Sequence, residues 1–258
     1  MMRIAVAGGT GTIGSEVVAA IRARGDEAVA LSRSTGVDVR TGEGLVAALE
    51  GVDALVDTAN VSSLSAKGST AYFTETTRTM LAAEREAGVG HHVLLSIVGI
   101  DEAPHGYYAG KVAQERAVEA GGVPWTTLRA TQVHEFAGQM LDALSMGGLH
   151  LAPVARTQPV AASEVGRRLA ELAAGAPAGR VRDLAGPREE RLDEMTRAYA
   201  RARGLRGPVV SVKLPGKQFQ SMRAGAALPG RDADLVGPTF DEWLATQGAE
   251  EAVRSQRA

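Results

Sequence analysis

A glycine-rich stretch near the N-terminus constrains the fold more than any other part of the sequence. Four apolar residues, Ile4–Ala7, precede a cluster of glycines, and apolar residues then recur at helical spacing. A short apolar run that is broken by glycines and followed by helical spacing predicts a strand, a tight turn and a helix. Because glycine allows positive φ and close backbone approach, a diphosphate can bind the amides at the start of such a helix.

The spacing of these glycines fits G-x-G-x-x-G counted from Gly9 and G-x-x-G-x-x-G counted from Gly8. Since the pattern follows a strand and opens a helix, it favours a dinucleotide-binding turn over a purely structural one. The residues expected to bind the cofactor here are Gly8, Gly9, Thr10, Gly11, Thr12, Ile13 and Gly14.

The first half of the chain alternates between strand and helix patterns. After the glycine turn, strands are expected over 27–31, 52–58, 92–97 and 125–129, and helices over 12–24, 43–50, 69–87 and 107–120. Alternation of this kind indicates βαβ units with right-handed crossovers. We therefore predict an α/β fold with a doubly wound parallel sheet, the Rossmann type, over residues 1–133.

The second half of the chain has a different pattern. Helices are expected over 136–146, 163–174, 189–203 and 240–245, with Ser163 suited to an N-cap, and short strands over 158–161, 180–184 and 208–212. Residues 134–258 are predicted to form a small α/β substrate lobe that packs closely on the first domain. Whether the lobe adds strands to the sheet of that domain stays open.

Composition excludes several classes of function. Lys and Arg total 28 against 30 Asp and Glu, which argues against a nucleic-acid or acidic-membrane surface. The absence of cysteine rules out disulfides and thiolate chemistry, and no His, Asp and Glu cluster has metal-ligand spacing. The apolar runs are too short for a secretory signal or a membrane span. We expect a cytoplasmic protein, a monomer or a homodimer, that acts on a small molecule.

Residues near the end of the second strand indicate which cofactor binds. Arg33, flanked by Ser32 and Ser34, lies nineteen residues after Gly14, and no acidic residue ends the strand. In dinucleotide folds an acidic residue there binds the ribose 2′-hydroxyl, whereas an arginine accommodates a 2′-phosphate. A guanidinium can pair with a phosphate bidentately. The sequence therefore predicts NADP(H).

Three further residues are candidates for contact with the cofactor. Asp38 has two open interpretations, because its carboxylate can accept from the adenine amino group or cap the following turn. Ala59 and Asn60 follow the third strand, at the edge where open parallel sheets hold ligands. A role for Asn60 as a turn residue alone also stays open.

Tyr107 and Lys111 are the candidate catalytic pair. They are four residues apart at a helix start, so both project from one face, and Ser96 ends the preceding strand. A tyrosine hydroxyl has a pKa near 10, and a nearby ammonium favours its ionised form. Such a pair suits proton transfer to a carbonyl or alcohol, while the nicotinamide supplies the hydride. Lys111 is also expected to hold the nicotinamide ribose, and Ser96 to orient the substrate oxygen.

The segment after the fifth strand supplies candidate substrate contacts. Thr131, Gln132 and His134 lie at the ligand edge of the predicted sheet, and they could line the substrate pocket, where His134 could titrate near physiological pH. A polar surface loop explains the same residues, and this alternative stays open.

Seven stretches resemble the NmrA-like, NAD(P)-binding branch of the atypical short-chain dehydrogenase/reductases, in the actinobacterial type. These stretches are Gly8–Gly14, Leu31–Arg33, Leu95–Gly99, Tyr107–Lys111, Pro124–Arg129, Asp183–Pro187 and Thr239–Leu244. The resemblance implies a Rossmann domain with a small substrate lobe, a pyrophosphate on the glycine turn and a 2′-phosphate on Arg33. It also implies catalytic roles for Ser96, Tyr107 and Lys111.

Two features depart from the family pattern. Gly110 replaces the more usual alanine before the lysine, and the interval from Ser96 to Tyr107 is short. The expected function is NADPH-dependent reduction of a small carbonyl or quinone-like substrate. Two alternatives are a non-catalytic NADP(H)-binding redox sensor and an epimerase or isomerase that retains its cofactor.

Overall fold

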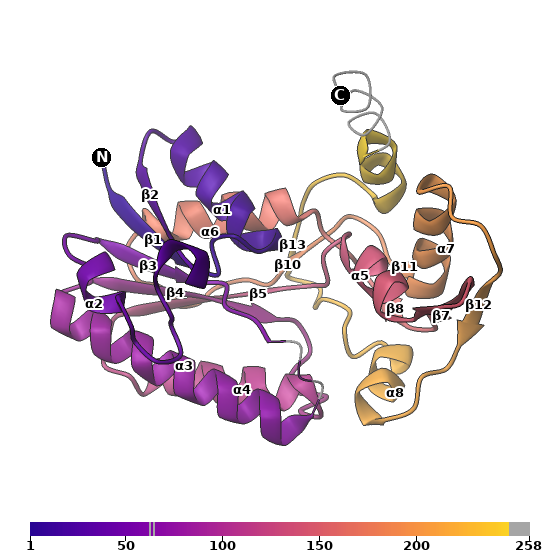
Figure 1. The fold of residues 1–258 in the computed structure, drawn as a ribbon, viewed down its shortest axis with the longest axis horizontal. Coiled ribbons are helices and arrows are strands. Elements are labelled where there is room, and N and C mark those ends of the chain that lie inside the picture. The colour runs from indigo at the N-terminus through magenta and orange to yellow at the C-terminus, as the bar shows by residue number, and fades with distance from the viewer. Residues whose placement is uncertain (62, 64, 248–258) are drawn as a thin grey trace.

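The computed structural model of the protein describes residues 1–61, 63 and 65–247. Within these residues, a parallel sheet runs in the order β13-β10-β5-β4-β3-β1-β2, with β9 beside β5 (Figure 1). All of its pairings are parallel, which confirms the doubly wound sheet. Its strands are β1 (Arg3–Ala7), β2 (Glu27–Leu31), β3 (Ala54–Asp57), β4 (His91–Ile97), β5 (Trp125–Ala130), β9 (Gly179–Arg180), β10 (Leu184–Ala185) and β13 (Asp234–Leu235).

Helices cover both faces of this sheet (Figure 1). On one face lie α1 (Thr12–Ala23) and α6 (Ala162–Ala173), and on the other lie α2 (Leu45–Ala48), α3 (Ala66–Ala87) and α4 (Tyr107–Glu119). The strand residues alternate between the two cores, because successive side chains of a strand point to opposite faces. Ile4 and Val6 pack with α1 and α6, whereas Ala5 and Ala7 pack with the α2 and α3 side. This explains why β1 is apolar throughout.

The strand order reverses direction at β1. This strand pairs with β2 on one side and β3 on the other, with Ala7 opposite both Leu31 and Asp57. The connection after β1 runs through α1 on one face of the sheet, and the connection after β3 runs through α3 on the other, so a crevice opens between the carboxyl ends of β1 and β3. The glycine turn that follows β1 lies at this crevice.

A smaller C-terminal lobe lies beside the sheet (Figure 1). Its core contains the buried side chains of Leu192, Met195, Phe240 and Trp243. After residue 157 the chain returns to the sheet as α6, β9 and β10, and later as β13. The elements of the lobe are α5 (Phe136–Ala143), β6 (Ser145–Met146), β7 (Leu149–Pro153), β8 (Arg156–Thr157), β11 (Glu190–Arg191), α7 (Leu192–Ala202), β12 (Val209–Val212), α8 (Lys217–Ala224) and the helix over 240–247.

The lobe differs from the sequence prediction in the helix expected over 136–146. The helix α5 ends at Ala143, and the next residues form β6, which pairs with β7 through Met146 and Leu149. The two residues between the strands, Gly147 and Gly148, have φ of 58° and 81°. Positive φ at both central positions is the geometry of a two-residue hairpin. The pair of glycines therefore makes a hairpin turn rather than merely stopping a helix.

Helix starts in the second half also differ from expectation. Ser163 is not the N-cap of α6, because the cap is Ala161, which makes no side-chain cap bond. The chain enters this helix from an extended segment in which Val160 N donates to Gln132 O at 3.0 Å. That segment replaces the strand expected over 158–161 with a single bridge between Val133 and Val160. Likewise, the helix expected from residue 189 starts at Leu192 because Glu190 and Arg191 pair with β8.

No helix among the described residues combines the length and the apolar character needed to cross a bilayer.

The contact between α1 and α6 generates a stability prediction. A Cβ at Gly166 would lie 2.7 Å from the backbone carbon of Glu16, so Gly166→Ala forces the two helices apart. Overpacking of this kind costs about 1–3 kcal/mol, which urea unfolding measures. Gly175→Ala, just after the same helix, is the matched control, since its nearest atoms lie at 3.5 Å. Equal unfolding free energies for the two variants would contradict the prediction.

Candidate functional site

The glycine turn brings the backbone of β1 and α1 closer than any side chain permits. Gly8 has φ +74°, and a Cβ there would lie 2.9 Å from the carbonyl oxygen of Thr58. A Cβ on Gly14 would lie 2.1 Å from the carbonyl oxygen of Gly8, and one on Gly9 would lie 2.9 Å from the Cβ of Ala30. Each of these positions therefore requires glycine for a steric reason. Together they allow α1 to begin directly over the end of β1.

The start of α1 has the chemistry of an anion site. Its N-cap is Gly11, which has no side chain to accept from the helix amides, and the first turn contains no acidic residue. Thr10 and Thr12 are exposed there, and Ile13 is half-buried. The positive end of the helix dipole and the amides of its first turn favour a negatively charged group. The residues present fit the diphosphate of a dinucleotide.

Arg33 lies in the short helix η1 (Arg33–Thr35) that follows β2. Its side chain is exposed and forms no hydrogen bond or ion pair with another described residue. The neighbouring hydroxyls bond each other, with 2.8 Å between Ser32 Oγ and Ser34 Oγ. Several exposed arginines have a carboxylate partner, such as Arg40 with Glu75 at 2.7 Å. Arg33 is a cation beside the crevice that has no such partner among the described residues.

Asp38 makes the turn-capping contacts that were one of its two expected roles. Its Oδ1 accepts from the amide of Arg40 at 2.8 Å and faces the amide of Thr41 at 3.4 Å. These bonds use one carboxylate oxygen to order the turn. Contact with an adenine amino group remains a prediction.

Asn60 contacts the candidate catalytic tyrosine. The hydroxyl of Tyr107 donates to Asn60 Oδ1 at 2.6 Å, and the same oxygen accepts from the amide of Val61 at 2.7 Å. The buried residue Ala59 precedes Asn60 just after β3, and its amide donates to Asp57 Oδ1 at 2.9 Å. The end of β3 and the start of α4 thus meet at the carboxyl edge of the sheet, where the sequence placed both.

Lys111, one turn after Tyr107 on α4, is buried. Its ammonium donates to the carbonyl oxygen of Leu95 at 2.8 Å and to Gln114 Oε1, and it lies 4.8 Å from the centre of the Phe73 ring. Burial lowers the pKa of this lysine to about 8. The pKa therefore falls close to neutral pH, where enzymes place acid/base groups.

Gly110 has a packing role that the sequence alone did not show. A Cβ there would lie 2.7 Å from the Cβ of Ser69 and 2.8 Å from Phe73 Cδ2. Glycine therefore lets α4 approach α3 closely enough for Lys111 to contact the Phe73 ring. The departure from the family's alanine is compensated by tighter packing between the two helices.

The expectation that Lys111 lowers the pKa of Tyr107 differs from the observed geometry. Burial raises the pKa of the Tyr107 hydroxyl, with smaller contributions in the same direction from Tyr108, Tyr72 and Asp57. The physical reason is that the ammonium of Lys111 bonds to Leu95 and Gln114 rather than to the phenol. In this arrangement Tyr107 stays protonated at neutral pH.

Ser96 forms no side-chain hydrogen bond with the tyrosine or any other described residue. It is 1% exposed, and its Oγ has no hydrogen-bond partner among the described residues. The next residue, Ile97, packs instead with the apolar cluster that includes Tyr107. A catalytic role for Ser96 remains a prediction that this geometry does not favour.

Thr131 and Gln132 lie at the edge of the sheet, and each has protein partners. Thr131 Oγ1 donates to the carbonyl oxygen of Gln158 at 2.6 Å. Gln132 Nε2 donates to the hydroxyl of Tyr108 at 2.9 Å, and Gln132 Oε1 accepts from Thr157 at 2.9 Å. These bonds tie the end of β5 to the C-terminal lobe. Substrate contact by either residue remains a prediction.

His134 is a core residue, so the expectation of titration near physiological pH is wrong. The side chain is fully buried against Phe240 and Trp243, and its Nε2 lies 3.2 Å from the carbonyl oxygen of Pro238. Burial lowers its pKa to about 4. The aromatic residues that desolvate this imidazole lie more than 100 positions later in the chain.

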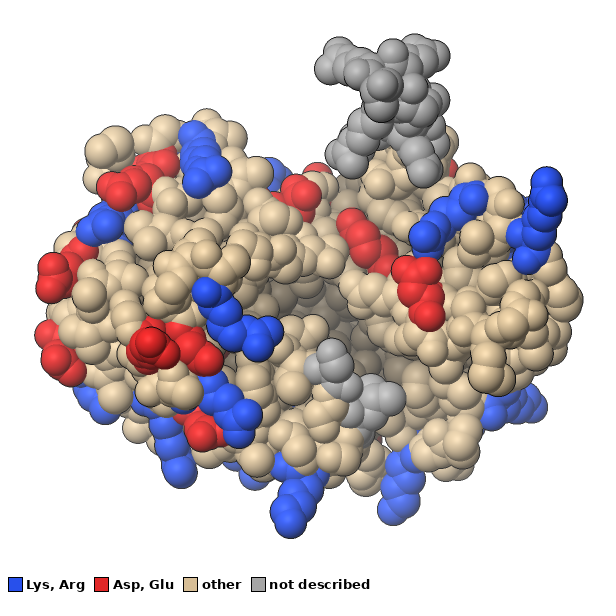
Figure 2. Space-filling view, in the orientation of Figure 1, with Lys and Arg blue, Asp and Glu red and all other residues tan. Residues whose placement is uncertain are grey.

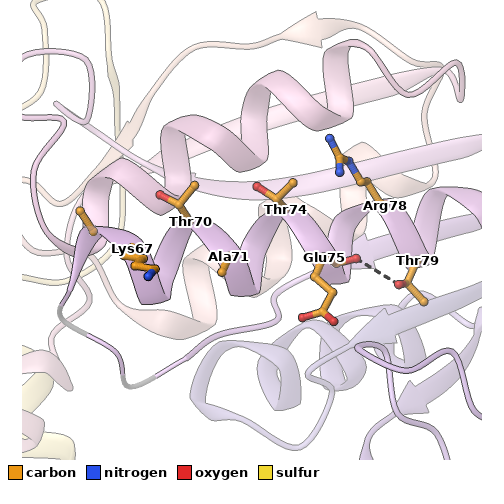
Figure 3. Close-up of a pocket in the computed structure, with 8 residues that line it drawn as sticks. Lys67, Thr70, Ala71, Thr74, Glu75, Arg78 and Thr79 are labelled. Atoms are coloured by element: carbon orange, nitrogen blue, oxygen red, sulfur yellow. Dashed lines mark hydrogen bonds between the residues drawn. The ribbon is translucent and has the colours of Figure 1, made fainter.

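A hollow separates the sheet domain from the C-terminal lobe (Figure 2). The walls seen in this view are mainly residues other than Lys, Arg, Asp and Glu, and charged groups gather around the rim (Figure 2). A separate open groove runs along the outer face of α3 and contains none of the predicted site residues (Figure 3). Its lining residues are Ala66, Lys67, Thr70, Ala71, Thr74, Glu75, Arg78 and Thr79.

Sequence reasoning missed three polar residues around the site. Gln114 and Asp57 are buried and bonded to each other, with 2.8 Å between Gln114 Nε2 and Asp57 Oδ2. Gln218 on α8 accepts from the amide of Tyr107 at 3.3 Å and so links the lobe to the site. Gln114 was detectable, because it lies three residues after Lys111 and thus on the same helix face. Gln218 had no sequence signal.

A model of the NAD(P)H-binding family matches residues 8–157, a segment that includes the glycine turn, Arg33, Tyr107 and Lys111. The chain belongs to this family. The resemblance read from the sequence is thereby confirmed at the level of NAD(P) binding. No curated protein sequence matches the chain.

Solved structures of similar fold cover nearly the whole chain of this NAD(P)H-binding protein. MoeE5, solved with UDP-glucuronic acid and NAD, is 21% identical at a TM-score of 0.72 and covers 98% of this chain and 99% of its own. The Escherichia coli quinone oxidoreductase QOR2, solved with NADPH, is 17% identical at 0.69, covering 95% and 99%. Triphenylmethane reductase of Citrobacter sp., solved with NADP(H), is 20% identical at 0.70, covering 96% and 100%. At these identities the likeness establishes the fold.

His134 generates a pH prediction. Its folded-state pKa of about 4 lies below the ordinary 6.5, so the unfolded chain takes up the proton first as the pH falls. The stability contribution is fully present above pH 6.5, and about 3 kcal/mol is lost on approach to pH 4. His134→Phe keeps an aromatic ring but has no proton to bind. Between pH 4 and pH 6.5, the slope of its unfolding free energy against pH should therefore be smaller than that of the wild type, by the equivalent of about one bound proton. Identical slopes in urea titrations of the two proteins would contradict this.

Proposed function

We propose that the protein is an NADPH-dependent oxidoreductase that reduces a small, uncharged carbonyl or quinone-like compound. The observation that carries the proposal is the meeting of Tyr107 and Asn60, at 2.6 Å, at the same edge of the sheet as the glycine turn. A proton donor and a cofactor site at one edge are the two requirements of hydride-coupled reduction.

The binding roles follow from the geometry at the crevice. The turn from Gly8 to Gly14 would hold the diphosphate, and Ile13, Thr10 and Thr12 border it. Arg33 would pair with the 2′-phosphate, because its guanidinium is exposed beside the crevice and has no carboxylate partner among the described residues. Ser32 and Ser34 would add hydroxyl donors, and Asp38 would border the adenine. Ala59 and Asn60 would border the cofactor close to Tyr107.

The chemical roles fall to the residues at the start of α4. When bound, NADPH supplies a hydride to the substrate carbon. Tyr107 donates its proton to the substrate oxygen, and the burial that raises its pKa keeps the phenol in the protonated form that donates. Lys111 would hold the nicotinamide ribose, and it places a buried positive charge one helical turn after Tyr107. Ser96 is a weaker candidate for orienting the substrate, since Asn60 already contacts the phenol.

The substrate class is inferred from the hollow between the two parts of the chain. Its visible walls carry few charged side chains (Figure 2). Arg and Lys side chains are common partners of a substrate diphosphate, so the scarcity of charged side chains on these walls favours a neutral, apolar electrophile over a nucleotide sugar. Thr131 and Gln132, which follow β5, are proposed to border this substrate. The protein is further proposed to act in the cytoplasm, as a monomer or a homodimer.

The choice of cofactor is tested by Arg33→Ala. Loss of charge-assisted hydrogen bonds to a phosphate costs about 1.5–3 kcal/mol, so the Kd for NADPH should rise roughly 10- to 100-fold. The Kd for NADH, which has no 2′-phosphate, should change less than about threefold. Fluorescence titration measures both, and Arg22→Ala, at the far end of α1, is the control. An equal loss of affinity for both cofactors would overturn the assignment to NADP(H).

The proposed reaction is tested by Tyr107→Phe. Removing a positioned proton donor should lower kcat about 100-fold or more while the Kd for NADPH stays within about threefold. The assay follows NADPH oxidation across a panel of carbonyls, quinones and enones. Tyr72→Phe is the control, because Tyr72 lies near the site and is not bonded to it. Tight NADPH binding without turnover on any compound would favour a redox sensor instead.

A further inference from the structure

A line of buried hydrogen bonds connects β3 with α4 beneath the site. Asp57, at the end of β3, accepts from the amide of Ala59 at 2.9 Å and from Gln114 Nε2 at 2.8 Å. Gln114 in turn accepts from the ammonium of Lys111. The side chains of Asp57, Gln114 and Lys111 are all buried, with at most 4% exposure. Water therefore does not compete for these bonds, and each is stronger than it would be at the surface.

The same line closes into a ring through Tyr107. Ala59, held by Asp57, is followed by Asn60, which accepts from the Tyr107 hydroxyl at 2.6 Å. Tyr107 and Lys111 then share the first turns of α4. The carboxylate of Asp57 is thus linked to both members of the proposed catalytic pair through one intermediate each: Oδ1 orders the segment that carries Asn60, and Oδ2 accepts from Gln114, which bonds Lys111.

The charges that face Lys111 come from two elements. Asp57 on β3 and Glu115 on α4 both raise its pKa, whereas burial lowers it. Glu115 already forms a two-pronged pair with Arg129, at 2.8 and 2.6 Å. Its charge is therefore largely matched by another cation. The carbonyl oxygen of Leu95 and the Phe73 ring add a dipolar and a cation–π contact.

We propose that Asp57 and Gln114 are positioning residues of the proposed reductase site, which together hold Lys111 and the Asn60 segment in one hydrogen-bonded ring around Tyr107. Only the catalytic role of these residues rests on the proposed function. The hydrogen-bonded ring exists whether or not the protein is a reductase, and the pKa of Lys111 reports on it. Neither residue touches the substrate, so each acts through Lys111 or Asn60.

The direction of the Gln114 amide follows from its neighbours. A lysine ammonium only donates and a carboxylate only accepts, so the amide must turn its oxygen to Lys111 and its nitrogen to Asp57. In Asp57→Asn this alternation of donors and acceptors is broken. If the asparagine oxygen still accepts from the Ala59 amide, the asparagine amino group faces the amino group of Gln114, and the bond between residues 57 and 114 is lost.

Exchanging the two groups restores the order. In the double variant Asp57→Asn/Gln114→Glu, the asparagine oxygen still accepts from Ala59 and its amino group donates to the glutamate. The second glutamate oxygen then accepts from Lys111. Total charge and side-chain volumes are preserved, and the carboxylate now touches the ammonium directly.

Lysine titration by NMR tests the ring. The chain contains four lysines, and Lys67, Lys213 and Lys217 are exposed, so isotope-labelled lysine gives one buried signal with three internal references. Wild-type Lys111 should titrate near its pKa of about 8. In Asp57→Asn that pKa should fall by about one unit, because an opposite charge is removed. In the double variant it should return to the wild-type value or exceed it.

Glu84→Gln is the matched control, since it also neutralises a buried carboxylate, one that bonds His92 at 2.7 Å instead of the ring. It should leave the Lys111 signal unchanged. Should Asp57→Asn not fold, the double variant and Gln114→Leu, which also lowers the pKa of Lys111, carry the test. An unchanged Lys111 pKa in folded Asp57→Asn or Gln114→Leu, or a lowered one in the double variant, would overturn the proposal.

Turnover then separates the two ideas. If the protein is a reductase, the alkaline limb of the kcat profile should shift with the Lys111 pKa in each variant. If NMR confirms the ring but the protein turns over no compound, the proposed function is refuted and the ring still stands. If the protein has turnover but its pH profile is the same in the wild type and the ring variants, the positioning role is refuted.

Discussion

The close approach of backbone to backbone at the glycine turn is the constraint on which the rest of the site depends. A Cβ on Gly14 would lie 2.1 Å from the carbonyl oxygen of Gly8, so no other residue lets α1 start directly above β1. Since β1 is the strand where the order of the sheet reverses, the amides of that helix face the crevice between β1 and β3. Arg33, which follows β2, and Asn60, which follows β3, lie at the same edge of the sheet.

Buried polar groups connect this crevice to the opposite layer of helices. Lys111, Gln114 and Asp57 are enclosed between β3, β4 and α4, where an unpaired polar group is costly and a paired one specifies a single arrangement. Gly110 makes that enclosure possible by letting α4 lie against Ser69 and Phe73. The residue that departs from the family pattern is thus the one that brings Lys111 to the Phe73 ring.

Local chemistry made much of the first half of the chain predictable. The apolar run of β1, the glycine spacing and the periodicity of α1 all depend on neighbours within a few positions, and their bounds agree with the structure within a residue or two. The second half was less predictable, because its elements are decided by distant partners. Ser163 looked like an N-cap, yet the pairing of Val160 with the segment after β5 makes Ala161 the N-cap, and the helix starts at Ala162.

The sequence by itself determined the family, the parallel sheet and a cofactor turn at its carboxyl edge, because these follow from short-range spacing and steric limits on glycine. Only the tertiary structure decided the environment of each titratable side chain. His134 became a core residue through Phe240 and Trp243, and the Lys111 ammonium turned to Leu95 and Gln114. Burial and hydrogen-bond partners set pKa values, and both arise from contacts between residues far apart in the chain.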